Sequence, residues 1–94
     1  MTQKYINKYT ILQDVTMEHA NRTLYRIKAL RDFDTVKAGD LGGWVESEDN
    51  LSQEGNCWIY GEAKVYNKAV VSDNAQIHGY SEISGCAQVY QNAH

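Results

Sequence analysis

An aliphatic residue recurs at every sixth position from residue 59 to the end of the chain. A small residue follows each aliphatic residue four positions later, and glycine, asparagine or aspartate follows it two positions later in five of the six repeats. A repeat of fixed length without insertions predicts a solenoid, in which each repeat packs on its neighbours. The aliphatic positions are Ile59, Val65, Val71, Ile77, Ile83 and Val89.

Each six-residue repeat, or hexad, contains the parts of a short strand and a corner. Because side chains alternate across a strand, a strand centred on the aliphatic residue directs it inward and its two neighbours outward. Glycine, asparagine and aspartate adopt positive φ at least cost, and only a small side chain fits inside the corner that they form. The period of six does not fit a helix. The pattern therefore predicts an all-β, parallel solenoid with corners at Gly61, Asn67, Asp73, Gly79, Gly85 and Gln91.

The hexads, together with the upstream segments 36–45, 50–52 and 55–60, resemble the hexapeptide-repeat left-handed β-helix proteins. The resemblance covers residues 24–94 and is strongest to a short group that is common in bacteriophages and prophages and related to an acetyltransferase-like bacterial protein. In this family three hexads form one triangular coil. The left-handed sense of the solenoid is implied by the resemblance alone. Ordinary parallel crossovers are right-handed, and the spacing of the hexads does not overturn that preference. The resemblance also implies three stacked pairs, namely Ile59 on Ile77, Val65 on Ile83 and Val71 on Val89.

Upstream of the regular hexads the six-residue register persists only in part. Leu41 falls at an aliphatic position, whereas Val45, Leu51 and Cys57 fall at corner positions. We therefore expect about three triangular coils in residues 41–94, of which the first is degenerate.

Residues 1–40 carry a different pattern. Residues 8–13 and 24–30 are β-prone, and Ala20 and Asn21 lie between them as a hairpin tip. We expect this part to form an amino-terminal β-hairpin cap over the first coil. At this length, the cap and the coils are predicted to form a single domain, 1–94.

Composition narrows the possible functions. The formal net charge is −3, which argues against nonspecific binding to nucleic acid, and 43% hydrophobic residues exclude a disordered chain. No apolar run approaches the length of a membrane span or a signal sequence, so we expect a cytoplasmic protein without a membrane partner. Residues 1–30 carry five basic and two acidic side chains, and residues 31–58 carry two and seven. The acidic part is interpreted as a solvated collar or, alternatively, as a patch for a basic partner.

The two cysteines indicate neither a disulfide nor a metal site. Cys57 falls at an inward position and Cys86 at a corner, in different registers, so we do not expect them to pair. Two cysteines alone offer no metal-ligand spacing, and we expect neither a metal nor a cofactor.

The outward positions are where we expect a binding function. Trp58 and Tyr60 flank Ile59, and His78 lies one coil later, so these three side chains are predicted to share one exposed face. Exposed aromatic side chains on such a face indicate a protein interface rather than a catalytic site. Lys64 is predicted to pair with Glu82 at the surface. The candidate interface residues are Trp58, Tyr60, Tyr66, His78, Tyr90 and Val89.

The resulting hypothesis is a non-enzymatic protein-binding module, encoded by a phage or prophage, that inhibits a host defence protein. It would act through the aromatic face or the open carboxy-terminal coil, and it would also associate with itself through that coil or the faces of the β-helix. The alternative is an acyltransferase-like enzyme with His78 as general base, because the enzymes that the chain resembles use a histidine between subunits. The chain departs from those enzymes in having few coils and no inserted loop to hold an acyl donor.

Overall fold

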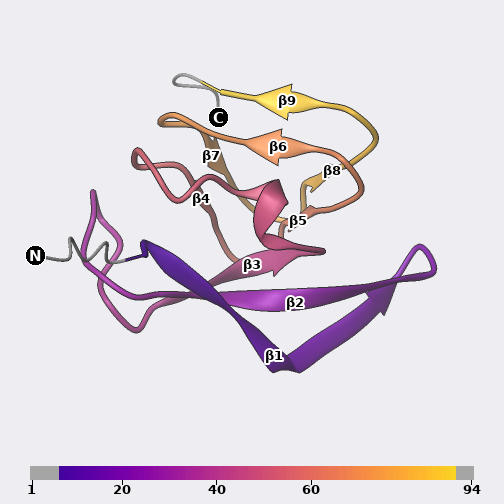
Figure 1. Ribbon diagram of the computed structural model, residues 1–94, viewed down its shortest axis with the longest axis horizontal. Helices are drawn as coiled ribbons and strands as arrows, with labels where there is room; N and C mark the ends of the chain where they lie inside the picture. The colour runs from indigo at the N-terminus through magenta and orange to yellow at the C-terminus, as the bar shows by residue number, and fades with distance from the viewer. Residues whose placement is uncertain (1–6, 91–94) are drawn as a thin grey trace, which may run out of the picture.

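The computed structural model describes residues 7–90, and β-strands are its main regular structure (Figure 1). Two long strands, β1 (Tyr9–His19) and β2 (Arg22–Ala29), form an antiparallel hairpin. The hairpin tip lies at Ala20 and Asn21, whose φ angles are 53° and 61°. The all-β class and the amino-terminal hairpin predicted from the sequence are therefore confirmed.

Short strands separated by corners make up the remainder of the described chain. β3 (Leu41–Val45) leads into a single 3₁₀ turn, η1 (Glu48–Asn50). Six strands of two residues each then follow at intervals of six residues, as the hexads predict. They are β4 (Trp58–Ile59), β5 (Lys64–Val65), β6 (Val70–Val71), β7 (Gln76–Ile77), β8 (Glu82–Ile83) and β9 (Gln88–Val89).

These short strands pair in parallel with the strand one turn later. β4 pairs with β7, β5 with β8 and β6 with β9, and the paired residues lie eighteen positions apart. The register matches the expected stacking of aliphatic side chains, with Ile59 beside Ile77, Val65 beside Ile83 and Val71 beside Val89.

The corners between the strands also form where the sequence predicts them. Each turns through one residue with positive φ, which is the conformation that glycine, asparagine and aspartate adopt at least cost. Gln91, the remaining predicted corner, lies outside the described residues. The observed φ angles are 63° at Gly61, 64° at Asn67, 59° at Asp73 and 68° at both Gly79 and Gly85.

The first turn corrects the predicted register. Val45 pairs with Val65, and Leu51 forms a bridge to Val71, so both extend the aliphatic columns instead of occupying corners. Both pairings span twenty residues rather than eighteen, because two extra residues lie between Leu51 and Ile59. Leu41, predicted at an aliphatic position, is 54% exposed. The prediction counted back from Ile59 in steps of six. The two extra residues shift that count, so these residues were assigned to the wrong positions.

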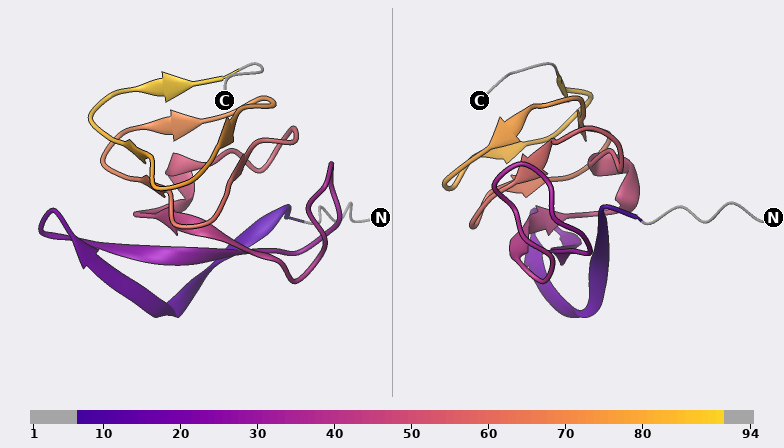
Figure 2. Two further views of the ribbon diagram at one scale, coloured as in Figure 1. Left: turned by 180° about the vertical axis from the view of Figure 1, so that it is seen from behind. Right: turned by 90° about the vertical axis from the view of Figure 1, so that its left-hand side faces the viewer.

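The hairpin and one face of the turns belong to a single five-stranded sheet, and the other two faces form separate two-stranded sheets, β4-β7 and β6-β9. The strand order of the five-stranded sheet is β1-β2-β3-β5-β8, in which β3 is antiparallel to β2 and parallel to β5. The hairpin lies across the amino-terminal end of the stack, and β9 lies at the opposite end (Figure 2). This arrangement agrees with the expected amino-terminal cap.

The core is tight at the capped end and opens towards the carboxy-terminal end. A Cβ on Gly43 would collide with the carbonyl oxygen of Ala63, so β3 packs against the next turn only because glycine is present. Val65 and Val71 are fully buried, whereas Ile83 and Val89 are only half-buried, because no described turn stacks on them.

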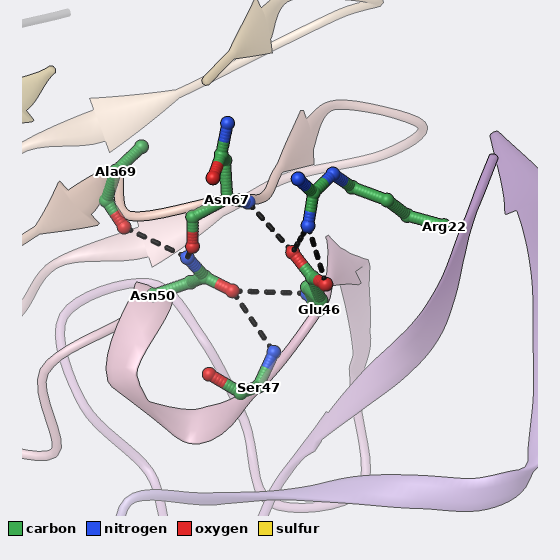
Figure 3. Close-up of polar contacts among 6 residues, drawn as sticks. All are labelled: Arg22, Glu46, Ser47, Asn50, Asn67 and Ala69. Carbon is green, nitrogen blue, oxygen red and sulfur yellow. Dashed lines mark hydrogen bonds and ion pairs between the residues drawn. The ribbon is translucent and has the colours of Figure 1, made fainter. Parts of the chain in front are cut away.

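Asn50 is the last residue of η1 and is fully buried (Figure 3). Its Oδ1 accepts hydrogen bonds from the backbone N–H groups of Glu46 and Ser47, at 3.0 and 2.9 Å. Its Nδ2 donates to the carbonyl oxygens of Asn67 and Ala69, at 3.2 and 2.8 Å. One side chain therefore satisfies backbone groups of two successive turns.

Candidate functional site

The sequence predicts Trp58 on an exposed aromatic face, and the structure shows that this prediction is wrong. Its side chain is 1% exposed and lies between two rings of the amino-terminal part. The ring centroids of Tyr9 and Phe33 are 6.3 and 5.2 Å away, both in edge-on geometry. Strand alternation does direct Trp58 away from the solenoid interior, but the hairpin and the segment after it cover that side. Its role is in the core.

Tyr60 and His78, in contrast, do lie together. Their rings are stacked with centroids 4.6 Å apart and planes 3° apart. Tyr60 is half-buried and His78 is exposed. The prediction that Tyr60 and His78 lie side by side is confirmed. Trp58 is not exposed beside them.

Tyr66 is also covered by the hairpin. It is 9% exposed and packs in a cluster with Leu24, Trp44 and Met17. Its hydroxyl donates a hydrogen bond to Oε1 of Glu82, at 3.2 Å. The hairpin therefore covers Tyr66, and the expectation that its side chain is exposed is wrong.

Two ion pairs and one contact between a histidine and a carboxylate connect the hairpin to the turns. Arg22 Nη1 lies 2.8 Å from Oε2 of Glu46 (Figure 3), and Arg26 Nη1 lies 3.2 Å from Oε2 of Glu62. His19 Nε2 lies 2.9 Å from Oε1 of Glu82. Of these three carboxylates only Glu46 belongs to the acidic part, residues 31–58, so one of its seven acidic side chains pairs with a basic side chain of residues 1–30 in this way.

The carboxylates of Glu62 and Glu82 have lowered pKa values for related reasons. A hydrogen bond from the Trp44 indole N–H, at 3.1 Å, and then the contact with Arg26 lower the pKa of Glu62. The hydrogen bond with His19 is the main cause of the lowered pKa of Glu82. Lys64, the predicted partner of Glu82, directs its Nζ to the carbonyl oxygen of Glu62 at 3.3 Å. In place of the predicted ion pair with Lys64, the Glu82 carboxylate contacts His19 of the hairpin.

A buried lysine is the polar group that sequence reasoning missed. Lys8 is fully buried, and its Nζ lies 2.7 Å from the carbonyl oxygen and 3.1 Å from the Sγ of Cys57. The carbonyl oxygens of Glu54 and Gly55 lie 3.4 Å away. Burial lowers the pKa of the Lys8 ammonium group. Lys8 contacts residues 54–57, which lie in the lengthened segment between Leu51 and Ile59, so it links β1 to the first turn.

An open groove lies on the face formed by β6 and β9. It has a volume of about 330 Å³ and is lined by five residues, which do not include His78. The stacked Tyr60–His78 pair lies on the β4–β7 face, so the exposed histidine and the groove are on different faces. The lining residues are Val70, Ser72, Asp73, Gln88 and Tyr90.

The carboxy-terminal coil, defined here as residues 77–90, has the most open surface of the described chain. β8 and β9 are each the last strand of their sheet, so no other described strand pairs with their outer edges. Tyr80 is 81% exposed and Tyr90 is 52% exposed. Glu82 is the one charged residue of this segment when histidine is neutral. Of the predicted interface residues, Tyr90, Val89 and His78 lie here.

The remaining expectations concern cysteines, metals and membranes. Cys57 is buried and Cys86 is exposed, and both are free thiols. Between residues 7 and 90, no cluster of three or more histidine, cysteine or acidic side chains is placed to hold a metal ion. Within the same residues, no helix is long and apolar enough to span a membrane.

Part of this chain is similar in sequence to part of a known protein. No family model matches the chain. A segment of 45 residues, 48% of this chain, is 49% identical to the uncharacterized acetyltransferase YdcK of Escherichia coli strain K12. The segment corresponds to 14% of that relative's length. The chain is therefore similar to part of that protein and spans only a small share of its length.

Proposed function

We propose that this protein is a non-enzymatic module that binds another protein through its carboxy-terminal coil. The observation that carries the proposal is the exposure of two tyrosines, Tyr80 at 81% and Tyr90 at 52%, beside β8 and β9, the outer strands of the described chain. Unpaired edges are templates for pairing with another chain, and proteins normally block them with charges or bulges.

The other edge of the five-stranded sheet has such protection. β1 carries a register shift between Leu12 and Thr16, and two acidic residues, Asp14 and Glu18, lie on it. β9 has no charged residue, and β8 has only Glu82. This contrast within one molecule favours the carboxy-terminal edges as the binding surface.

The proposal includes the finer fold and the biological context. The eighteen-residue register supports a β-helix of about three triangular coils within a single domain, and the resemblance supports the left-handed twist. The resemblance also motivates a phage or prophage origin, a cytoplasmic location and a host defence protein as the inhibited target.

Affinity capture from a bacterial lysate, followed by calorimetry with the identified partner, tests the binding function. Replacing either exposed tyrosine, Tyr80→Ala or Tyr90→Ala, should weaken binding by about 1–3 kcal/mol, because aromatic anchors dominate interface energetics. Leu30→Ala is the matched control, since Leu30 is 42% exposed but lies beyond the hairpin. Equal binding by all three variants would contradict the proposed surface.

The second candidate is an acyltransferase-like enzyme in which His78 acts as general base. The similarity to a protein named as an acetyltransferase and the exposure of His78 beside Tyr60 favour it. A thermal-shift titration with acetyl-coenzyme A distinguishes the two functions, because a ligand that binds the folded state raises the unfolding midpoint. A shift that His78→Gln abolishes would support the enzyme, and no shift at saturating ligand would support the binding module.

A further inference from the structure

We propose that Cys57 and Lys8 form an oxidative modification site, at which hydrogen peroxide joins the cysteine Sγ to the lysine Nζ by a covalent bond. The two atoms lie 3.1 Å apart, and both side chains are fully buried. Because the two residues are 49 positions apart in the chain, the bond would tie the start of the hairpin to the first turn. Tyr80 and Tyr90 lie after β7, so the site is separate from the proposed binding surface.

The polar neighbours of the lysine nitrogen direct it at the sulfur. Besides Sγ, Nζ contacts the carbonyl oxygens of Glu54, Gly55 and Cys57, at 3.4, 3.4 and 2.7 Å. A carbonyl oxygen only accepts hydrogen bonds, whereas a thiol also donates one. When the nitrogen is neutral, its lone pair therefore has the S–H group as its one donor among these four neighbours. The reactive lone pair of the amine then points at Sγ.

The surroundings of Lys8 favour the neutral amine, which is the nucleophilic form of lysine. Burial is the main cause of the lowered pKa of the Lys8 ammonium group; its interaction with Cys57 opposes this effect, and the charge of Arg31 adds to it. The Phe33 ring covers the group, with its centroid 5.2 Å from Nζ. Transfer of the thiol proton to the neutral amine gives a thiolate, the form of cysteine that attacks a peroxide. The pair therefore supplies both reactants.

Two balanced steps form the bond. In the first, the thiolate sulfur attacks one oxygen of hydrogen peroxide and the O–O bond breaks. The leaving hydroxide takes a proton from the Lys8 ammonium group, which leaves a sulfenic acid, a neutral amine and water. In the second, the amine lone pair attacks the sulfur, the S–O bond breaks, and the leaving hydroxide takes one N–H proton. The sulfur is oxidised, the peroxide is reduced to two molecules of water, and a sulfenamide remains.

The segment that covers the pair provides the route for peroxide. Residues 54–56 are exposed and belong to no strand or helix. Glu54 and Gly55 of this segment supply two of the carbonyl oxygens around Nζ. Exposed turns open at a lower free energy than paired strands do, and peroxide is a small molecule. Opening of this one turn is therefore enough to admit it.

Peptide mapping by mass spectrometry in a Cys86→Ser background tests the bond. Cys86 is exposed, and its replacement leaves Cys57 as the one thiol of the chain. After hydrogen peroxide and then trypsin, the peptides of Lys8 and Cys57 should be recovered as one species, lighter than their sum by two hydrogen atoms. Dithiothreitol should separate them. Trypsin divides the two ends of the bond because five basic residues lie between them, namely Arg22, Arg26, Lys28, Arg31 and Lys37.

Lys8→Arg is the matched variant, because arginine keeps the positive charge but its guanidinium stays protonated and does not attack the sulfur. It should form no link. The same substitution at Lys28, an exposed position on β2, should link as the background protein does. Urea denaturation of the background protein gives a second readout that does not depend on how Lys8→Arg folds. The midpoint should rise after peroxide and return after dithiothreitol, since a link between distant residues restricts the unfolded chain.

Three results would overturn the inference. The first is a sulfenic or sulfinic acid at Cys57 beside an unmodified Lys8. The second is a Cys57 thiol that survives the peroxide concentration at which Cys86 of the native protein is oxidised. The third is a linked product that retains an oxygen atom, which would refute the direct bond and indicate an S–O–N bridge between the same two side chains.

Discussion

At the residue scale, Lys8 and Tyr9 connect the start of the described chain to the first turn. The Tyr9 hydroxyl donates to the carbonyl oxygens of Leu51 and Glu48, and burial raises the pKa of that phenol well above its ordinary value. The neighbouring Lys8 ammonium lies among backbone carbonyl oxygens. Together the two side chains donate to backbone carbonyl oxygens of the first turn between residues 48 and 57.

Lys8→Met retains the length of the side chain and removes its charge. We expect the free energy of unfolding to fall by about 2 kcal/mol, because a charge-assisted hydrogen bond is lost and buried carbonyl oxygens lose a donor. Urea denaturation measures the change. Lys28→Met, on the exposed side of β2, is the control and should leave stability nearly unchanged. Equal stability of both variants would show that water replaces the ammonium group without cost.

Glu62 makes a pH-dependent contribution to stability. Its pKa in the folded state lies below its ordinary value of 4.5, chiefly because of the Trp44 indole and then Arg26, so the unfolded chain binds the proton more readily. The contribution is therefore present above pH 4.5 and is lost as the pH falls through the folded-state value. Urea midpoints at decreasing pH should fall less steeply for Glu62→Gln than for the native protein. Glu54→Gln, with an exposed side chain, is the comparison, and the same slope in all three proteins would contradict the assignment.

At the element scale, η1 links the irregular first turn to the regular one through Asn50. A Ser47 N-cap begins η1, and Asn50 completes a reciprocal capping box while also reaching Asn67 and Ala69 in the next turn. The element is three residues long, too short for stability of its own. Its position depends on this single buried side chain.

Asn50→Ala should therefore lower the free energy of unfolding by about 2–3 kcal/mol, because backbone groups of both turns are left without partners. Chemical denaturation measures the loss, and hydrogen exchange should show faster exchange at Ser47, whereas the Glu46 N–H keeps the carbonyl oxygen of Val65 as a second acceptor at 3.3 Å. Asn56→Ala, at an exposed position, should change stability by less than about 0.5 kcal/mol. Unchanged exchange at Ser47 would refute the role of Asn50.

At the scale of the whole molecule, stability depends on the continuity of the aliphatic columns. Val71 is fully buried between Leu51 and Val89 in one such column. Val71→Asp would bury a charge without a polar partner in an apolar column, and we expect a loss of about 4 kcal/mol or more, with no cooperative transition remaining. Circular dichroism during heating measures it. Lys68→Asp, at an exposed corner, is the control, and a native-like transition in Val71→Asp would show that Val71 does not face inward.

The sequence by itself determined the regular part of the fold and its register. A hexad contains its own strand, corner residue and small residue, so the positions of β4 to β9 and of the five described corners follow from local conformational preferences. It also indicated the hairpin, because the tip and the two alternating runs are short-range signals. These features depend on residues within a few positions of each other.

Only the tertiary structure decided what the outward side chains meet. Alternation directs Trp58 and Tyr66 away from the interior, but the hairpin packs over both and buries them. The same long-range packing gives Glu82 the partner His19 in place of Lys64. It also reveals the insertion before Ile59, because strand pairing shows which residues stack across a change of spacing. Contacts between distant segments depend on how the whole chain folds back on itself, and no local pattern encodes that path.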